Sequence, residues 1–103
     1  MLNNIGLVYN SLGQYPQALD HYQRALTIIQ ELGDQQREGT TLHNIGAIYD
    51  NLGQYPEALD YYQRALKIAQ NIGDRAGEGR TLNNIGLVYD SLGQYPQALD
   101  YYQ

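Results

Sequence analysis

Apolar side chains recur along the chain with the spacing of an α-helix. Leu42, Ile45, Gly46, Tyr49 and Leu52 follow one another at offsets of three, four, seven and ten residues from the first. This spacing places them on one face, since an α-helix has about 3.6 residues per turn. The pattern therefore predicts a helix with one buried face in this stretch.

The following segment carries a wider apolar band. A helix with so wide a band is covered on two sides, so we expect this one to pack between two neighbours. The band is made of Ala58, Leu59, Tyr61, Tyr62, Ala65, Leu66, Ile68, Ala69 and Ile72.

Glycine, proline and aspartate mark where these helices end and begin. Gly53 is suited to end the first helix, because glycine readily adopts the left-handed conformation. Pro56 suits the first turn of the next helix, where its missing N–H costs nothing. Gly73 closes that helix, and Asp74 offers a carboxylate oxygen to the free N–H groups of the following one. The pair at 33–34 repeats this arrangement.

The whole pattern repeats with a period of forty residues. Leu12, Leu52 and Leu92 each begin the sequence LGQYP. Helix follows helix without a strand pattern, which indicates a stacked array of helices. The predicted helices cover residues 1–12, 15–32, 35–52, 55–72, 75–92 and 95–103.

Charge and composition exclude several classes of function. Six basic against eleven acidic residues give a net charge of −5, which disfavours nucleic acid and anionic membrane surfaces as partners. No apolar run approaches the roughly 18–20 residues that span a bilayer. The chain has no cysteine, so disulfides and cysteine zinc sites are excluded. This composition favours a cytoplasmic protein.

No pattern of catalytic or metal-binding residues is present. His21 and His43 are the only histidines, and they fall on different predicted helices without partners at ligand spacing. We predict no catalytic residue, no metal site and no cofactor. The acids at 20 and 60 each precede an arginine by four residues, which predicts exposed ion pairs along a helix.

The run LNNIGLVYDSLGQYPQALDYYQ at 82–103 resembles a tetratricopeptide repeat (TPR). In the complete unit, Ile45 and Gly46 stand for the Leu-Gly pair of that motif and Tyr49 for its tyrosine. The small, aromatic and small positions of the second helix are Ala58, Tyr62 and Ala65.

The forty-residue period is longer than the usual TPR period of about 34 residues. In this the chain is similar to the long-period TPRs of the kinesin light chain and Pins types and to bacterial TPR arrays. The resemblance implies an all-α fold, a right-handed superhelical solenoid of antiparallel helix pairs with about two and a half repeats. We expect a single array over 1–103, with units at approximately 1–34, 35–74 and 75–103.

The resemblance also implies a function in protein–protein interaction, because the first helix of each TPR lines the concave surface that binds a peptide segment. The residues opposite the apolar face of these helices are the candidates for that groove. They are Asn3, Asn4, Leu7, Asn10 and Ser11, then Thr40, His43, Asn44, Ala47, Asp50 and Asn51, and finally Arg80, Asn83, Asn84, Leu87, Asp90 and Ser91.

The candidate groove is rich in amides, which can donate to and accept from a peptide backbone. Asp50 and Asp90 favour a protein or peptide partner that carries some positive charge. Arg80 alone is basic at the edge, so capture of an acidic tail is disfavoured. The alternative is that these positions are ordinary solvated polar residues.

A second hypothesis is structural. The predicted helices at the two ends of the chain would leave apolar side chains without partners, so copies could stack head-to-tail or swap helices. A third is that the chain is an idealised or truncated piece of a longer array with no ligand of its own.

Overall fold

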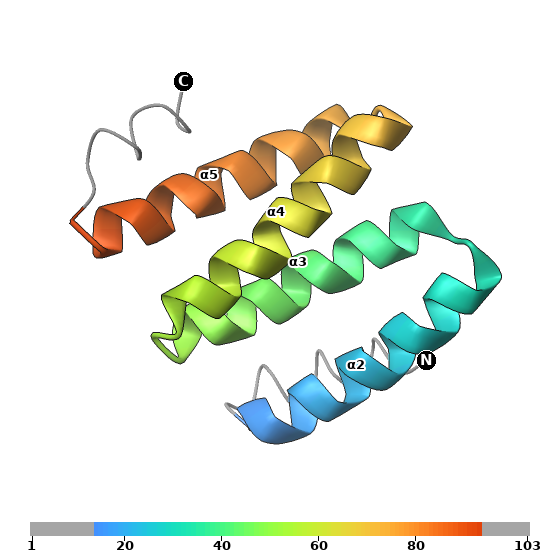
Figure 1. The fold of residues 1–103 in the computed structure, drawn as a ribbon, viewed down its shortest axis with the longest axis horizontal. Helices are drawn as coiled ribbons and strands as arrows, with labels where there is room; N and C mark the ends of the chain where they lie inside the picture. Colours follow the sequence, from blue (N-terminus) through green and yellow to red (C-terminus); the bar gives the residue numbers. More distant parts are fainter. Residues whose placement is uncertain (1–13, 94–103) are drawn as a thin grey trace.

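The computed structural model describes residues 14–93, which form four α-helices and no strand (Figure 1). The predicted helices in this range are confirmed to within one residue at each end. The predictions for residues 1–12 and 95–103 lie outside the described residues. The helices are α2 (Tyr15–Leu32), α3 (Gln35–Asn51), α4 (Tyr55–Ile72) and α5 (Arg75–Ser91).

The helix ends have the predicted geometry. Gly33, Gly53 and Gly73 have φ angles of 70°, 75° and 73°, in the left-handed region that glycine tolerates. Asp74 caps α5 by accepting a hydrogen bond from the backbone N–H of Gly77 at 2.9 Å. These short connections turn each helix back on the one before, which produces the antiparallel row seen in Figure 1.

Helix α4 packs between α3 and α5, as its wide apolar band predicts. One buried cluster joins Tyr22 of α2 to Ile45 of α3 and Ala65 of α4. A second joins Tyr62 of α4 to Ile85 of α5. Stacking of one helix pair on the next therefore buries a continuous core.

The contact between α3 and α4 depends on small residues. A Cβ atom placed on Gly46 would lie 2.8 Å from Cδ1 of Tyr62 and 3.3 Å from the carbonyl oxygen of Ala58. No side chain fits in that space, so glycine is what allows the two backbones to approach this closely. The predicted role of Gly46 in close packing is confirmed.

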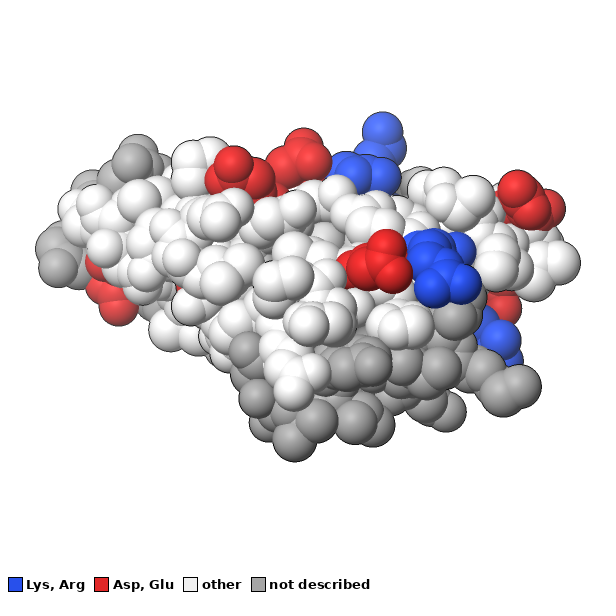
Figure 2. Space-filling model, turned by 90° about the horizontal axis from the view of Figure 1, so that it is seen from below, with Lys and Arg blue, Asp and Glu red and all other residues white. Residues whose placement is uncertain are grey.

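The surface carries charges of both signs. The predicted pairs within helices are present, with Arg24 3.7 Å from Asp20 and Arg64 3.9 Å from Asp60. Figure 2 shows basic and acidic side chains interspersed among uncharged ones on one face. Among residues 14–93, no helix is long and apolar enough to cross a membrane.

Candidate functional site

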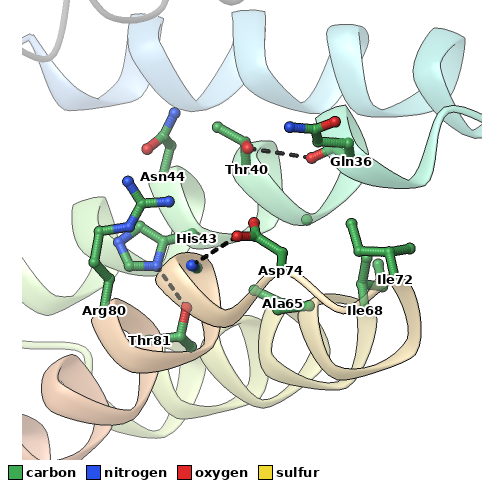
Figure 3. A pocket seen from close by; sticks show the side chains of 13 residues that line it. Gln36, Thr40, His43, Asn44, Ala65, Ile68, Ile72, Asp74, Arg80 and Thr81 are labelled. Atoms are coloured by element: carbon green, nitrogen blue, oxygen red, sulfur yellow. Dashed lines mark hydrogen bonds between the residues drawn. The ribbon is translucent and has the colours of Figure 1, made fainter.

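A cavity of about 200 Å³ opens between α3, α4 and the start of α5 (Figure 3). Because α3 and α5 are the first helices of successive helix pairs, the cavity lies at the junction of two repeats. Its lining consists of Gln36, Gly39, Thr40, His43 and Asn44 from α3, Ala65, Ile68, Ala69 and Ile72 from α4, and Asp74, Gly77, Arg80 and Thr81 from the α5 side.

The floor of the cavity is apolar and its walls are polar. All four lining residues from α4 are Ala or Ile. Gly39 keeps the wall close to this floor, since a Cβ on Gly39 would lie 3.2 Å from Cγ2 of Ile68. The cavity thus offers an apolar base for an aliphatic group, with amide, hydroxyl and charged groups around it.

His43 bridges the two first helices. Its Nδ1 lies 3.1 Å from Thr81 Oγ1, and its Nε2 lies 3.1 Å from Asn84 Nδ2, both on α5. The amide nitrogen of Asn84 is a donor, so Nε2 accepts and Nδ1–H donates to Thr81. The ring is therefore held in its neutral form, in one tautomer, beside the cavity.

Arg80 lies at the rim of the cavity, and Figure 3 shows its guanidinium extending past His43 toward Asn44. Burial lowers the pKa of His43, and the positive charge of Arg80 lowers it further. The pair therefore places one permanent positive charge next to an imidazole that resists taking a second.

Arg80 differs from the other arginines in its partners. Each of the other four lies within 4 Å of a carboxylate, as in the pair of Arg75 with Glu78 at 3.5 Å. Among residues 14–93, Arg80 forms no such ion pair. Its guanidinium donors remain available in the cavity.

Asp50 has a partner within the fold. It accepts a hydrogen bond from the hydroxyl of Tyr62 at 3.5 Å. Burial raises the pKa of Asp50, and this hydrogen bond partly offsets the rise. Asp50 is therefore partly withdrawn from solvent, and it does not line the cavity.

The sequence profile of the tetratricopeptide repeat family matches residues 1–71 and again residues 37–103, so the two matches cover the whole chain. The chain belongs to the tetratricopeptide repeat family. No curated protein sequence matches the chain significantly.

Solved structures have the same TPR fold. The TPR domain of Arabidopsis FLU is 24% identical with a TM-score of 0.92, over 98% of this chain and 85% of that domain. Aspartyl phosphate phosphatase F from Bacillus subtilis is 25% identical with a TM-score of 0.93, over 97% of this chain and 26% of that protein. The Rap conjugation gene regulator of plasmid pLS20, solved in complex with the Phr* peptide, is 22% identical with a TM-score of 0.87, over 97% and 28%.

The family assignment confirms the all-α solenoid predicted from the sequence. It also assigns the chain to a fold that serves as a scaffold for protein–protein interaction. Across the part of the chain that the structure describes, no three His, Asp or Glu side chains gather as metal ligands would.

The structure brings some of the predicted groove residues together at the cavity. Thr40, His43, Asn44 and Arg80 all line it. The others on α3 and α5 lie elsewhere on those helices, and the predicted residues on the first helix lie outside the described residues. Away from the cavity are Ala47, Asp50, Asn51, Asn83, Asn84, Leu87, Asp90 and Ser91; outside the described residues are Asn3, Asn4, Leu7, Asn10 and Ser11.

The candidates from the sequence omitted the floor of the cavity. Ala65, Ile68, Ala69 and Ile72 were assigned to the core, because an apolar residue on a doubly covered helix has the same pattern whether it packs or lines a cavity. One signal could have identified the site, since Ala69 is smaller than Ile29, which occupies the same position one unit earlier.

Proposed function

We propose that the chain binds an unstructured segment of a partner protein along the surface formed by α3 and α5. The observation that carries this proposal is the cavity between these two helices, with its apolar floor and polar walls. An apolar pocket with a few convergent polar groups is typical of a binding site. The same fold in the Rap regulator is solved with a bound peptide, which supports the choice of ligand class.

Asn44 supplies the matching polar contact. Its side chain is half-buried and turns toward the cavity, where its amide can both donate to and accept from a peptide bond (Figure 3). A partner segment would lie across the two helices, with side chains entering the cavity and backbone groups meeting the amides. The absence of cysteine supports a cytoplasmic location for this interaction.

A display library of random 12-residue peptides, selected against the whole chain, tests this function. Peptides that bind should shift the backbone NMR resonances of α3 and α5 and of the α4 floor. Asn44→Ala should weaken them about five-fold or more, since a lost hydrogen bond costs about 1 kcal/mol. Asn71→Ala, at an exposed position outside the cavity, is the control and should change nothing. Failure to select any peptide, or shifts confined to the opposite faces of α2 and α4, would contradict the proposal.

A further inference from the structure

We propose that the cavity at the junction of α3, α4 and α5 recognises one carboxylate next to an aliphatic side chain of the bound segment. Arg80 would hold the carboxylate, and the α4 floor would take the aliphatic group. This inference rests on the proposed function and specifies the chemistry of its ligand. It reverses the sign of the charge that Asp50 and Asp90 suggested, for the part of the partner that enters this cavity.

The first argument comes from comparing equivalent positions of the repeats. Eight lining residues belong to the α4 and α5 side of the cavity, and each has a counterpart forty positions earlier. Four are the same residue in both units, at positions 65, 68, 74 and 81. The four that differ are Ala69, Ile72, Gly77 and Arg80, which stand where the earlier unit has Ile29, Leu32, Arg37 and Thr40.

These differences change both the space and the charge at this junction. Ala69 and Gly77 are smaller than their counterparts, which removes side-chain volume from the floor and from the wall of α5. Arg80 brings a positive charge where Thr40 has none. Within a nearly periodic sequence, the substitutions that hollow the site and the one that charges it thus occur together.

The second argument is the charge that remains uncompensated. The carboxylate of Asp74 also lines the cavity, but it accepts the Gly77 N–H at the start of α5, where a helix favours negative charge. Arg80 has no carboxylate partner among residues 14–93. A guanidinium can hold a carboxylate through two parallel hydrogen bonds. The cavity therefore complements a negative group at its rim.

The third argument concerns size. A volume of about 200 Å³ suits one aliphatic side chain with a neighbouring carboxylate rather than a longer segment. The net charge of −5 on the whole chain would repel a run of acidic residues. A single carboxylate satisfies both conditions. It could belong to a Glu or Asp side chain or to the C-terminus of the partner.

A peptide array on the whole chain distinguishes these possibilities. The probes are octapeptides with random flanking residues and a central Leu-Glu, Leu-Gln, Leu-Lys or Ser-Glu pair, acetylated and amidated at their ends. A further set ends in leucine with a free carboxylate. We expect Leu-Glu peptides to bind at least about ten-fold more tightly than Leu-Gln peptides, because charge-assisted hydrogen bonds are about twice as strong as neutral ones. Tighter binding of the free-carboxylate set would identify the chain terminus as the source.

Two substitutions taken from the earlier repeat localise the effect. Arg80→Thr should abolish the preference for Leu-Glu over Leu-Gln, and Ala69→Ile should abolish the preference for Leu-Glu over Ser-Glu by filling the floor. Arg75→Gln is the matched control, because it also removes one positive charge and also takes the residue found forty positions earlier. Circular dichroism of each variant establishes that it is folded.

The outcomes separate the two proposals. If no peptide binds, both the groove function and this inference are wrong. If peptides bind α3 and α5 but Leu-Glu has no advantage, or if Arg80→Thr and Arg75→Gln reduce that advantage equally, the groove function stands and this inference is wrong. Tighter binding of Leu-Lys peptides would also overturn it, in favour of the positively charged partner expected from the sequence.

Discussion

The aromatic ring of Tyr62 fills the space that a side chain at position 46 would need. A Cβ on Gly46 would meet Cδ1 of Tyr62 at 2.8 Å, and it would face the α4 backbone beside Ala58. The contact joins the two helices of one TPR. Small residues at this point thus determine the distance between helices, and with it the shape of the surface that α3 and α5 present.

Gly46→Ala should lower the free energy of unfolding by up to about 2 kcal/mol. The gain in helix propensity is about 1 kcal/mol, but overpacking costs about 1–3 kcal/mol. Gly79→Ala is the matched control, because within the described part of the chain a Cβ there meets nothing within 4 Å. That change should raise stability by about 0.5–1 kcal/mol. Urea denaturation measures both, and equal stabilisation by the two changes would refute the packing argument.

Acidification should destabilise the chain through His43. Burial and Arg80 lower the pKa of His43 in the folded state, so the unfolded chain takes up the proton first. The stability contributed by the neutral ring is complete above about pH 6.5, the pKa of an unperturbed histidine, and is lost as the pH falls below it. The slope from one group is at most about 1.4 kcal/mol per pH unit.

Denaturation curves between pH 5 and 8 would reveal this dependence. His43→Asn, which takes the residue found at Asn83, should flatten it relative to the parent chain. His21→Tyr retains His43 and should keep the full contribution of that ring. A parent chain and a His43→Asn variant with the same pH profile would show that His43 does not titrate with folding.

Removing the charge of Arg80 should raise the pKa of His43. Arg80 disfavours the protonated ring, so Arg80→Thr removes one of the two causes of the low value and leaves burial. An NMR titration of the imidazole resonances measures the change. Arg75→Gln should produce a smaller change, because Arg75 is not given among the charges that act on His43. Identical titration curves for the parent and Arg80→Thr would place Arg80 too far from the ring to matter.

The hydroxyl of Tyr62 should control the ionisation of Asp50. The hydrogen bond lowers the pKa of Asp50 against the opposing effect of burial. Tyr62→Phe should therefore raise the pKa of Asp50 further. A carbon-detected NMR titration of the side-chain carboxyl would measure it. An unchanged titration would mean that the contact of 3.5 Å is too long to act as a hydrogen bond in solution.

Much of this fold was predictable because local rules govern a repeat protein. The helix boundaries followed from left-handed glycines such as Gly53, from Pro56 and from the capping carboxylate of Asp74. Each of these acts through its own backbone or that of residues three or four positions away. Close packing at Gly46 was also predictable, because a costly glycine in a helix recurs at the same place in every unit.

The site was only partly predictable. Periodicity located Thr40, His43, Asn44 and Arg80 on the exposed side of their helices, and all four line the cavity. Periodicity does not tell whether an apolar residue such as Ile68 fills a core or floors a cavity. That depends on how far apart the neighbouring helices lie, which is set by residues distant in the chain.

The amino-acid sequence of this protein is sufficient to specify its helices, their order and its TPR family, since these follow from spacing along one chain. The bridge from His43 to Thr81 and Asn84, the partner of Asp50 and the unpaired guanidinium of Arg80 follow only from the folded arrangement. They join residues on different helices, and their distances result from packing rather than from sequence separation. Charge and hydrogen-bond partners at the groove are therefore properties of the assembled repeats.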